Sequence, residues 1–311
     1  MIPDLRRRVE GGLLGLLVGD ALGVPYEFHP PEALPPADQL DMPPPAGFRR
    51  AHAGVPPGTW SDDGAQALVL LDSLLANDGL DLRHFADGLL RWRHEGFHAV
   101  DGRVFDIGIQ TSTALDRLRA GVPPEEAGPA GERHNGNGAL MRVLPLALWH
   151  RGDDDELVAL AMRQALPTHG HAWSRVACAH YCLWARAELR DDIDSWRTAE
   201  ARTRALLSDA PWLRDAVERV LDPANAAAAR GTGFVIDTLW SAKHAVESTG
   251  DYETCVRRAI AYGHDTDTTA CVAGGIAGIR HGVDAIPRRW LDALRAREVV
   301  AALLDRLTVD A

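Results

Sequence analysis

The chain has 311 residues, of which 46% are hydrophobic and 25% charged, a balance typical of a globular protein with a substantial core. Its net charge of −11 excludes a nucleic-acid-binding surface as the leading interpretation, because neutralising phosphates requires clustered Lys and Arg. The four cysteines include no CxxC pair, which favours a reducing compartment over secretion, and we expect a cytoplasmic protein.

The first apolar stretch, residues 11–22, is short and contains Asp20, so we expect neither a signal peptide nor a membrane span. Glycines recur there at every fourth position, and they recur again near residue 280. The two series are Gly11, Gly15, Gly19, Gly23 and Gly274, Gly278, Gly282. Residues four apart share one helix face, so each series predicts a smooth ridge that another backbone can approach. This packing is either ordinary core packing or a device that brings two helix ends into one site.

Residues 30–57 hold nine of the nineteen prolines. Proline fixes φ and removes an amide donor, so the segment is predicted to be an extended loop rather than a helix. Two interpretations stay open, a lid over the functional site and a plain surface excursion.

Helical periodicity dominates the rest of the chain, whereas alternating strand-like runs are nearly absent. Apolar residues recur at helical spacing from Leu68 to Leu75 and in six later runs. These runs are 158–165, 177–189, 212–221, 235–246, 252–261 and 290–304. No linker divides the chain, so we predict an all-α fold with ten or more helices in a single compact domain spanning residues 1–311.

Three acidic clusters are the strongest functional signal. They are Gly19-Asp20-Ala21-Leu22-Gly23 followed by Glu27, Trp60-Ser61-Asp62-Asp63-Gly64, and Gly263-His264-Asp265-Thr266-Asp267-Thr268-Thr269. The last two immediately precede apolar helical runs, so each is a candidate N-cap, and Asp63 with Gln66 resembles a capping box. Capping needs only one acceptor per helix, however, and adjacent carboxylates repel unless a cation lies among them. Oxygen ligands without His or Cys suit Mg²⁺ or Mn²⁺, and two converging helix starts could hold a pair of ions.

Two weaker signals lie between these clusters. Residues 135–142, Asn-Gly-Asn-Gly-Ala-Leu-Met-Arg, predict either a backbone that approaches a ligand closely at a helix start or a common Asn-Gly turn. His169, after Thr168, is either a ligand-side residue or an ordinary core histidine.

Taken together, the motifs G-D-A-L-G…E, W-S-D-D-G, G-N-G-x-x-M-R, T-H and G-H-D-T-D-T resemble those of the ADP-ribosylglycohydrolase family. They occur in family order from residue 11 to about 282. The resemblance implies an all-α fold with a two-Mg²⁺ cleft, in which Mn²⁺ is a possible substitute. It also implies a hydrolase that cleaves the glycosidic bond between ADP-ribose and a modified acceptor, with ADP-ribosyl-arginine on protein as the first candidate.

The resemblance further implies residue roles. The metal ligands would be Ser61, Asp62, Asp63, Asp265, Asp267 and Thr268. The catalytic candidates are Glu27, Asp62, Asp63 and Asp265, with the general base left open between Glu27 and a metal-bound Asp. Substrate would be held by Gly136, Asn137, Gly138 and His169. Ser61 stands where many members have Thr, and His264 where many have Gly.

Two other functions compete with this one. An HD-type metal phosphohydrolase would use the doublet His264-Asp265 with His244 and Asp284, but it would not require residues 61–63 or 135–138. A non-catalytic ADP-ribose-binding protein would be expected to have lost metal ligands, and all six are present. The expected partner is an ADP-ribosylated protein or small molecule, with no nucleic acid or membrane, and the expected oligomeric state is a monomer.

Overall fold

The computed structural model describes residues 4–308, which form an all-α single domain. The α-helices are α1 (Leu5–Gly23), α2 (Asp62–Asn77), α3 (Leu82–Glu95), α4 (Ile109–Arg119), α5 (Pro124–Ala127), α6 (Leu144–Trp149), α7 (Asp154–Ala165), α8 (Ala172–Leu189), α9 (Ser195–Leu207), α10 (Pro211–Val220), α11 (Asn225–Ala228), α12 (Val235–Glu247), α13 (Tyr252–Ile260), α14 (Thr266–His281), α15 (Arg288–Ala293) and α16 (Arg297–Leu307). Short 3-10 helices are η1 (Val24–Tyr26), η2 (Pro31–Ala33), η3 (Ala37–Gln39), η4 (Val100–Gly102) and η5 (Val283–Ala285). Within this part of the chain no strand forms, and the only β-type pairing is an isolated bridge between Gly136 and Phe234. The predicted fold class is confirmed.

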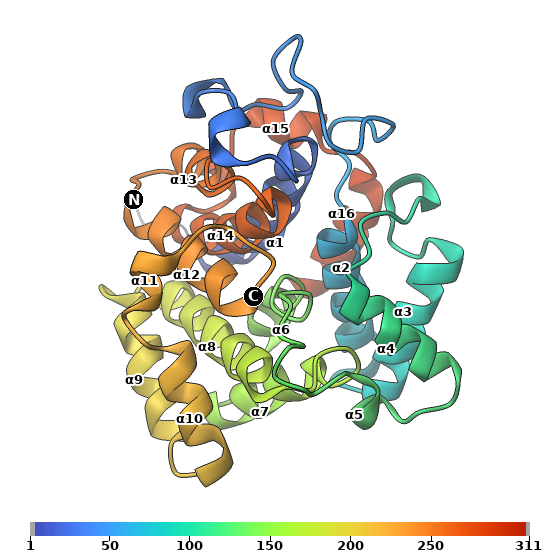
Figure 1. Cartoon of the computed structure of the whole chain (residues 1–311), viewed down its shortest axis with the longest axis vertical. Helices are drawn as coiled ribbons and strands as arrows, with labels where there is room; N and C mark the ends of the chain where they lie inside the picture. Colours follow the sequence, from blue (N-terminus) through green and yellow to red (C-terminus); the bar gives the residue numbers. More distant parts are fainter. Residues whose placement is uncertain (1–3, 309–311) are drawn as a thin grey trace.

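Helices α1 and α14 lie side by side at the centre of the domain (Figure 1), although more than 240 residues separate them in sequence. The predicted glycine ridges are their interface. A methyl group added at Gly15 would lie 2.4 Å from the Gly274 carbonyl oxygen, and one added at Gly278 would lie 1.9 Å from that of Gly11. At Gly23 the methyl group would lie 2.4 Å from the Cα of Asp267. The two backbones therefore touch, and the end of α1 is held against the start of α14.

Replacing Gly19 with alanine is expected to destabilise the protein by roughly 3 kcal/mol, at the upper end for overpacking. The added Cβ would meet the Ala270 carbonyl oxygen at 2.1 Å, and a main-chain atom inside a helix cannot rotate away. Thermal and urea unfolding would measure the change. The control is Gly250→Ala, because nothing lies within 4 Å of a Cβ at that position. Equal stabilities for the two variants would contradict backbone contact.

The other helices surround this pair. Helices α8 and α12 pack on α14, and α2 packs on both α1 and α14 (Figure 1). Most of the sequence-predicted helices form near their expected bounds, but the run predicted over 290–304 is broken into α15 and α16. The break occurs because Ala296 adopts left-handed backbone angles (φ 45°, ψ 37°) and the Arg295 amide donates to the Gly58 carbonyl oxygen at 3.0 Å. A tertiary contact thus interrupts a continuous apolar pattern.

The proline-rich segment 30–57 contains no α-helix, as predicted, but it is not extended throughout, because it includes the 3-10 helices η2 and η3. It is anchored near its middle by Asp41, whose carboxylate pairs with Arg257 and Arg289, and by the Arg257 guanidinium, which donates to the Leu40 carbonyl oxygen at 2.9 Å. Its later part contacts Glu27, which lines the cleft described below, through His52. That the segment moves as a lid stays a prediction.

All four cysteines are buried free thiols. Burial raises the pKa of Cys178 to about 12, which keeps it in the thiol form and supports its interpretation as core filling. No helix among residues 4–308 is long and apolar enough to span a membrane.

Candidate functional site

The acidic clusters and the glycine loop predicted from sequence meet in one cleft of about 280 Å³. The cleft is lined by nine of the residues singled out in the sequence: Glu27, Asp62, Asp63, Gly136, Asn137, Gly138, His169, Asp265 and Thr268. These residues come from the position just after η1, the starts of α2 and α14, and the loops before α6 and α8. The structure therefore assembles elements distributed over more than 240 residues of sequence.

The carboxylate of Asp20 fixes the start of α2. It is fully buried and accepts hydrogen bonds from the Ser61 amide at 2.9 Å and the Gly64 amide at 2.7 Å. Burial raises the pKa of Asp20 to about 7, and these two main-chain donors oppose that rise. Asp20 therefore holds the first turn of α2 in place rather than lining the cleft.

The N-cap of α2 is Ser61, not Asp63 as the capping-box interpretation suggested. The Ser61 hydroxyl accepts from the Asp63 amide at 3.2 Å. Because the Ser61 hydroxyl and the Asp20 carboxylate accept from the first amides of α2, the carboxylates of Asp62 and Asp63 remain available to the cleft. Both are buried, and each has a pKa raised well above its usual range by burial and by neighbouring carboxylates.

The start of α14 also carries carboxylates, but it lacks a side-chain cap. Asp265 occupies the N-cap position, yet its side chain makes no capping hydrogen bond. One carboxylate oxygen from each of Asp265, Asp267 and Glu27 lies within 4.8 Å of the other two. The Thr268 hydroxyl donates to Asp63 at 3.4 Å, which links the starts of α14 and α2. Capping therefore does not account for the acidic residues at this helix end.

The chemistry of these groups fits divalent cations. Three carboxylate oxygens, Asp63 Oδ2 and both oxygens of Asp267, are buried without a hydrogen-bond partner among the described residues. An unpaired buried carboxylate is strongly unfavourable in its charged form, which is why the pKa of Asp267 is raised well above its usual range. Cations coordinated by oxygen would remove both the desolvation cost and the mutual repulsion. The observed environment thus matches the ligand chemistry of Mg²⁺ or Mn²⁺.

The Asn-Gly-Asn-Gly loop lies against this cluster. The Asn137 side-chain amide donates to Asp265 at 2.8 Å and to the Thr238 hydroxyl at 2.9 Å. The Asn137 main-chain amide donates to the Gly233 carbonyl oxygen at 3.1 Å. The loop does not open an α-helix, since α6 begins only at Leu144, so the predicted helix-start phosphate site is wrong in that respect. The position of the loop in the cleft wall agrees with close approach to a ligand.

His169 forms part of the same wall. Its Nδ1 lies 2.8 Å from the Thr168 hydroxyl, and a Cβ built at Gly138 would lie 2.9 Å from its Cε1. Burial and the nearby Arg142 guanidinium lower the pKa of His169 well below its usual range, so its imidazole is neutral at pH 7. A neutral ring can donate or accept a hydrogen bond toward the cleft without adding charge.

One positioning residue was missed by the sequence analysis. Arg142 is fully buried, and its guanidinium donates to the Gln66 side-chain oxygen at 2.9 Å. Gln66 in turn donates to Asp62 Oδ2 at 3.2 Å. Burial lowers the pKa of Arg142 to about 10, yet it stays charged at pH 7. The Arg142 guanidinium thereby fixes Asp62 through the Gln66 side-chain amide. Because Arg142 ends the motif G-N-G-x-x-M-R, the motif could have indicated this role.

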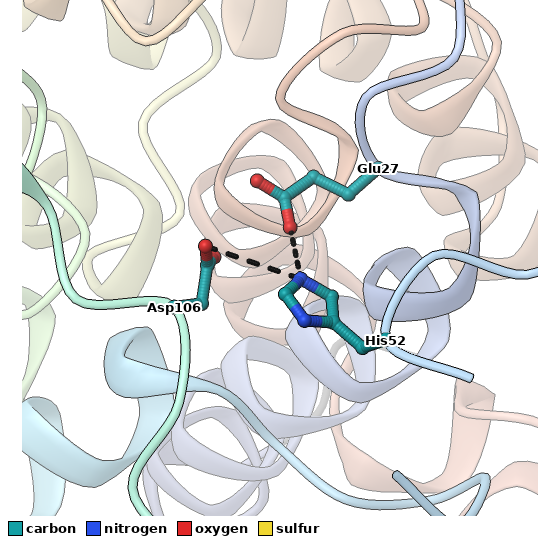
Figure 2. Close-up of side chains that lie close together, drawn as sticks. All are labelled: Glu27, His52 and Asp106. Atoms are coloured by element: carbon teal, nitrogen blue, oxygen red, sulfur yellow. Dashed lines mark hydrogen bonds and ion pairs between the residues drawn. The ribbon is translucent and has the colours of Figure 1, made fainter. Parts of the chain in front are cut away.

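A second cluster shares Glu27 with the first. His52 Nε2 lies 2.7 Å from Glu27 Oε2 and 3.9 Å from Asp106 Oδ1 (Figure 2). Burial and, next, the nearby Asp106 carboxylate together raise the pKa of Glu27 to about 11. Neither His52 nor Asp106 was singled out by sequence, because both lie in irregular segments without a local motif. Asp106 lines the cleft.

The HD-type arrangement does not form. His264 is exposed and adopts left-handed backbone angles (φ 60°). Many members of the resembled family have glycine at this position, and glycine adopts this conformation freely. His244 contacts the Tyr262 hydroxyl at 2.7 Å, and Asp284 pairs with Arg7 on the exposed surface. Asp265 instead turns toward Glu27 and Asp267. The sequence doublet is therefore incidental, and His264 lies outside the cleft lining.

Comparison with known proteins adds independent evidence. The ADP-ribosylglycohydrolase family model matches residues 1–311. The ADP-ribosylarginine hydrolase Tri1 of Serratia proteamaculans is 30% identical, over 99% of this chain and 81% of that protein. The ADP-ribosyl-[dinitrogen reductase] glycohydrolase of Rhodospirillum rubrum is 28% identical, over 94% of this chain and 92% of that one. A solved structure described as an ADP-ribosylglycohydrolase-related protein complex superposes with a TM-score of 0.75 at 36% identity, covering 98% of each chain.

Proposed function

The chain belongs to the ADP-ribosylglycohydrolase family, and on that premise we propose that it is a Mg²⁺-dependent hydrolase that releases ADP-ribose from modified arginine side chains of proteins. The observation that carries the proposal is a cleft lined by buried carboxylates and a glycine loop, with unpartnered carboxylate oxygens on Asp63 in its lining and on Asp267 beside Asp265. Two relatives described above are named as hydrolases of ADP-ribosylated arginine or of an ADP-ribosylated protein.

The residues divide into two groups by position. Asp62, Asp63, Asp265, Asp267 and Thr268 would hold the metal ions, and the Ser61 hydroxyl, which now accepts from the Asp63 amide, would complete the set. Bound ions would orient the ribose hydroxyls and lower the pKa of a coordinated water. The glycine loop and His169, on the adjoining wall, would hold the ADP-ribosyl group.

The acceptor would lie at the opposite end of the cleft, near Glu27 and Asp106. Cleavage of a glycosidic bond passes through an oxocarbenium-like state that nearby carboxylates stabilise, and a carboxylate activates the attacking water. Bound cations would lower the raised pKa of Glu27 and favour its carboxylate form, so the water-activating base is either Glu27 or a carboxylate of the metal cluster. A guanidinium leaving group carries positive charge, and two carboxylates so placed would bind it by charge-assisted hydrogen bonds. This charge pattern favours arginine over a neutral serine acceptor.

Turnover of ADP-ribosyl-arginine, ADP-ribosyl-serine and O-acetyl-ADP-ribose tests the proposal. We expect hydrolysis of the arginine substrate first, complete loss of activity in EDTA, and recovery on adding Mg²⁺ or Mn²⁺. Chromatographic detection of free ADP-ribose is the measurement. Full turnover in protein shown to hold no metal would refute the metal requirement, and preference for ADP-ribosyl-serine would reassign the acceptor. ADP-ribose binding without any turnover would favour a non-catalytic binding protein.

Replacing Gly138 with valine is expected to weaken ADP-ribose binding by about tenfold or more, because a Cβ there would lie 2.9 Å from His169 and 3.1 Å from the Thr111 hydroxyl. Those two neighbours would have to move into the space that the ligand needs. Isothermal titration calorimetry with ADP-ribose measures the change, with Gly250→Val as a folded control. Unchanged affinity in a folded Gly138→Val protein would make residues 135–138 a plain turn.

A further inference from the structure

A second hollow, of about 520 Å³, adjoins the cleft and shares Glu27 with it. Glu27, Phe28 and His29 form one side, and Phe48, Arg49 and Arg50 from the proline-rich segment form the other. We call it the flanking groove. Because Glu27 is common to both hollows, the groove begins where the acceptor would leave the cleft.

Aromatic rings form the body of this groove. Phe48 packs against Tyr26 and His29, with ring centroids 5.1 and 5.0 Å apart. Phe28 stands at the rim with 68% of its surface exposed, and its ring lies 5.5 Å from that of His52. Its backbone has φ 62°, a costly conformation for a non-glycine residue, and its amide donates to the His264 carbonyl oxygen at 2.7 Å. The fold thus holds an apolar ring in solvent beside the cleft mouth.

The charge of the groove is opposite to that of the protein. Among residues 4–308, Arg49 has no ion-pair or hydrogen-bond partner, and the Arg50 guanidinium donates only to the Ala53 carbonyl oxygen at 3.0 Å. Neither guanidinium is neutralised by a carboxylate, although the whole chain has a net charge of −11. The groove's own carboxylate, Glu27, is 5% exposed and is already engaged by His52. The groove therefore offers two adjacent unneutralised guanidinium groups above an aromatic surface.

We propose that the flanking groove binds an acidic peptide segment of the acceptor protein, next to the modified residue. The inference rests on the proposed function, because it places the scissile bond beside Glu27. Guanidinium groups bind carboxylates with two parallel hydrogen bonds, and the exposed Phe28 ring would cover the apolar part of a peptide. Surface pairs of this kind add modest affinity and are screened by salt, so the groove would select among acceptors rather than hold them tightly.

The test compares three substrates: free ADP-ribosyl-arginine, a modified peptide with Asp and Glu flanking the arginine, and the same peptide with Asn and Gln. We expect the wild-type protein to show a roughly three- to tenfold lower KM for the acidic peptide than for the neutral one, with equal kcat. In Arg49→Glu/Arg50→Glu that preference should vanish or invert. Hydrolysis of free ADP-ribosyl-arginine should change less than about twofold, because that substrate does not enter the groove.

The matched control is Arg83→Glu/Arg214→Glu, which makes the same charge change on α3 and α10, away from both hollows. It should keep the wild-type preference, and high salt should reduce that preference. Equal KM values for the acidic and neutral peptides in the wild type, or a preference that survives in Arg49→Glu/Arg50→Glu, would overturn the inference. So would a dimer, seen by sedimentation, that Arg49→Glu/Arg50→Glu disrupts, because a second copy would then be the occupant.

Failure of the proposed function is separable from failure of this inference. If the Mg²⁺-loaded protein does not hydrolyse free ADP-ribosyl-arginine, the proposed acceptor is wrong whatever the groove binds. Fluorescence anisotropy with the unmodified acidic peptide then tests the groove directly. Tighter binding by the wild type than by Arg49→Glu/Arg50→Glu would support the groove, and equal binding would refute it.

Discussion

Replacing Asp63 with asparagine is expected to lower kcat for ADP-ribosyl-arginine by about a thousandfold while the protein stays folded. Asp63 is 1% exposed, and its Oδ2 atom is buried without a partner among the described residues, so a bound cation would balance its charge. An amide has nearly the same shape, which limits the change to charge and ligand strength. Initial rates in saturating Mg²⁺ measure the effect.

The control for this variant is Asp72→Asn, on the same helix. Asp72 pairs with Arg306 at the surface, 3.5 Å away, and lies outside the cleft lining. It should retain wild-type turnover. Comparable activity in Asp63→Asn and Asp72→Asn would remove Asp63 from the metal centre.

The second large effect is a reversal of stability in Asp265→Asn. In EDTA this variant is expected to melt no lower than the wild type, and higher if repulsion between carboxylates dominates. A like-charge pair at 4 Å costs about 4 kcal/mol at an effective dielectric of 20, before proton uptake relieves the repulsion. In excess Mg²⁺ the order should invert, since the wild type gains binding energy that the variant loses. Differential scanning calorimetry under both conditions measures the two differences.

Solution pH provides the internal control for this experiment. Burial raises the pKa of Glu27 to about 11 from an ordinary value of 4.5, so above about pH 4.5 the folded metal-free protein keeps a proton that the unfolded chain releases. The contribution of this proton to the free energy of unfolding is complete at low pH. It is lost as pH rises toward the pKa of Glu27 in the folded protein. Metal-free wild type should therefore melt lower at about pH 9 than at about pH 5, and the advantage of Asp265→Asn should widen.

A helix-cap role for Asp265 predicts a different result. Asparagine caps nearly as well as aspartate, so the variant would then differ little from wild type in either condition. The structure already argues against that role, because the Asp265 side chain makes no capping hydrogen bond. A melting difference that is identical with and without Mg²⁺, together with full activity, would exclude Asp265 as a metal ligand.

Features that repeat or cluster in sequence were predictable. The four-residue glycine spacing permits close backbone approach where the helix packs. The contact of Gly15 with Gly274 is the observed result. The acidic groups at residues 61–63 and 265–268 exceed what a cap requires, and the cleft lining includes Asp62, Asp63, Asp265 and Thr268. Such patterns are local, so one stretch of sequence contains the whole signal.

Features that depend on tertiary placement were not predictable. His52 and Asp106 lie in irregular segments, and only the fold brings them to Glu27 (Figure 2). The division of the run 290–304 follows from a hydrogen bond to Gly58, far away in the chain. Asp20 belonged to a recognised motif, yet its task of holding the α2 start is visible only when the Ser61 and Gly64 amides are placed.

The backbone contact between α1 and α14 also bears on how the protein is made. During synthesis, residues 5–23 leave the ribosome long before residues 266–281. The glycine-lined face of α1 therefore has no α14 to pack against while most of the chain is translated. Closing a loop of this length is slow, and every carboxylate pair between Glu27 and α14 depends on it. Assembly of the cleft is then a late event of folding, and the apolar face of α1 stays exposed until it occurs.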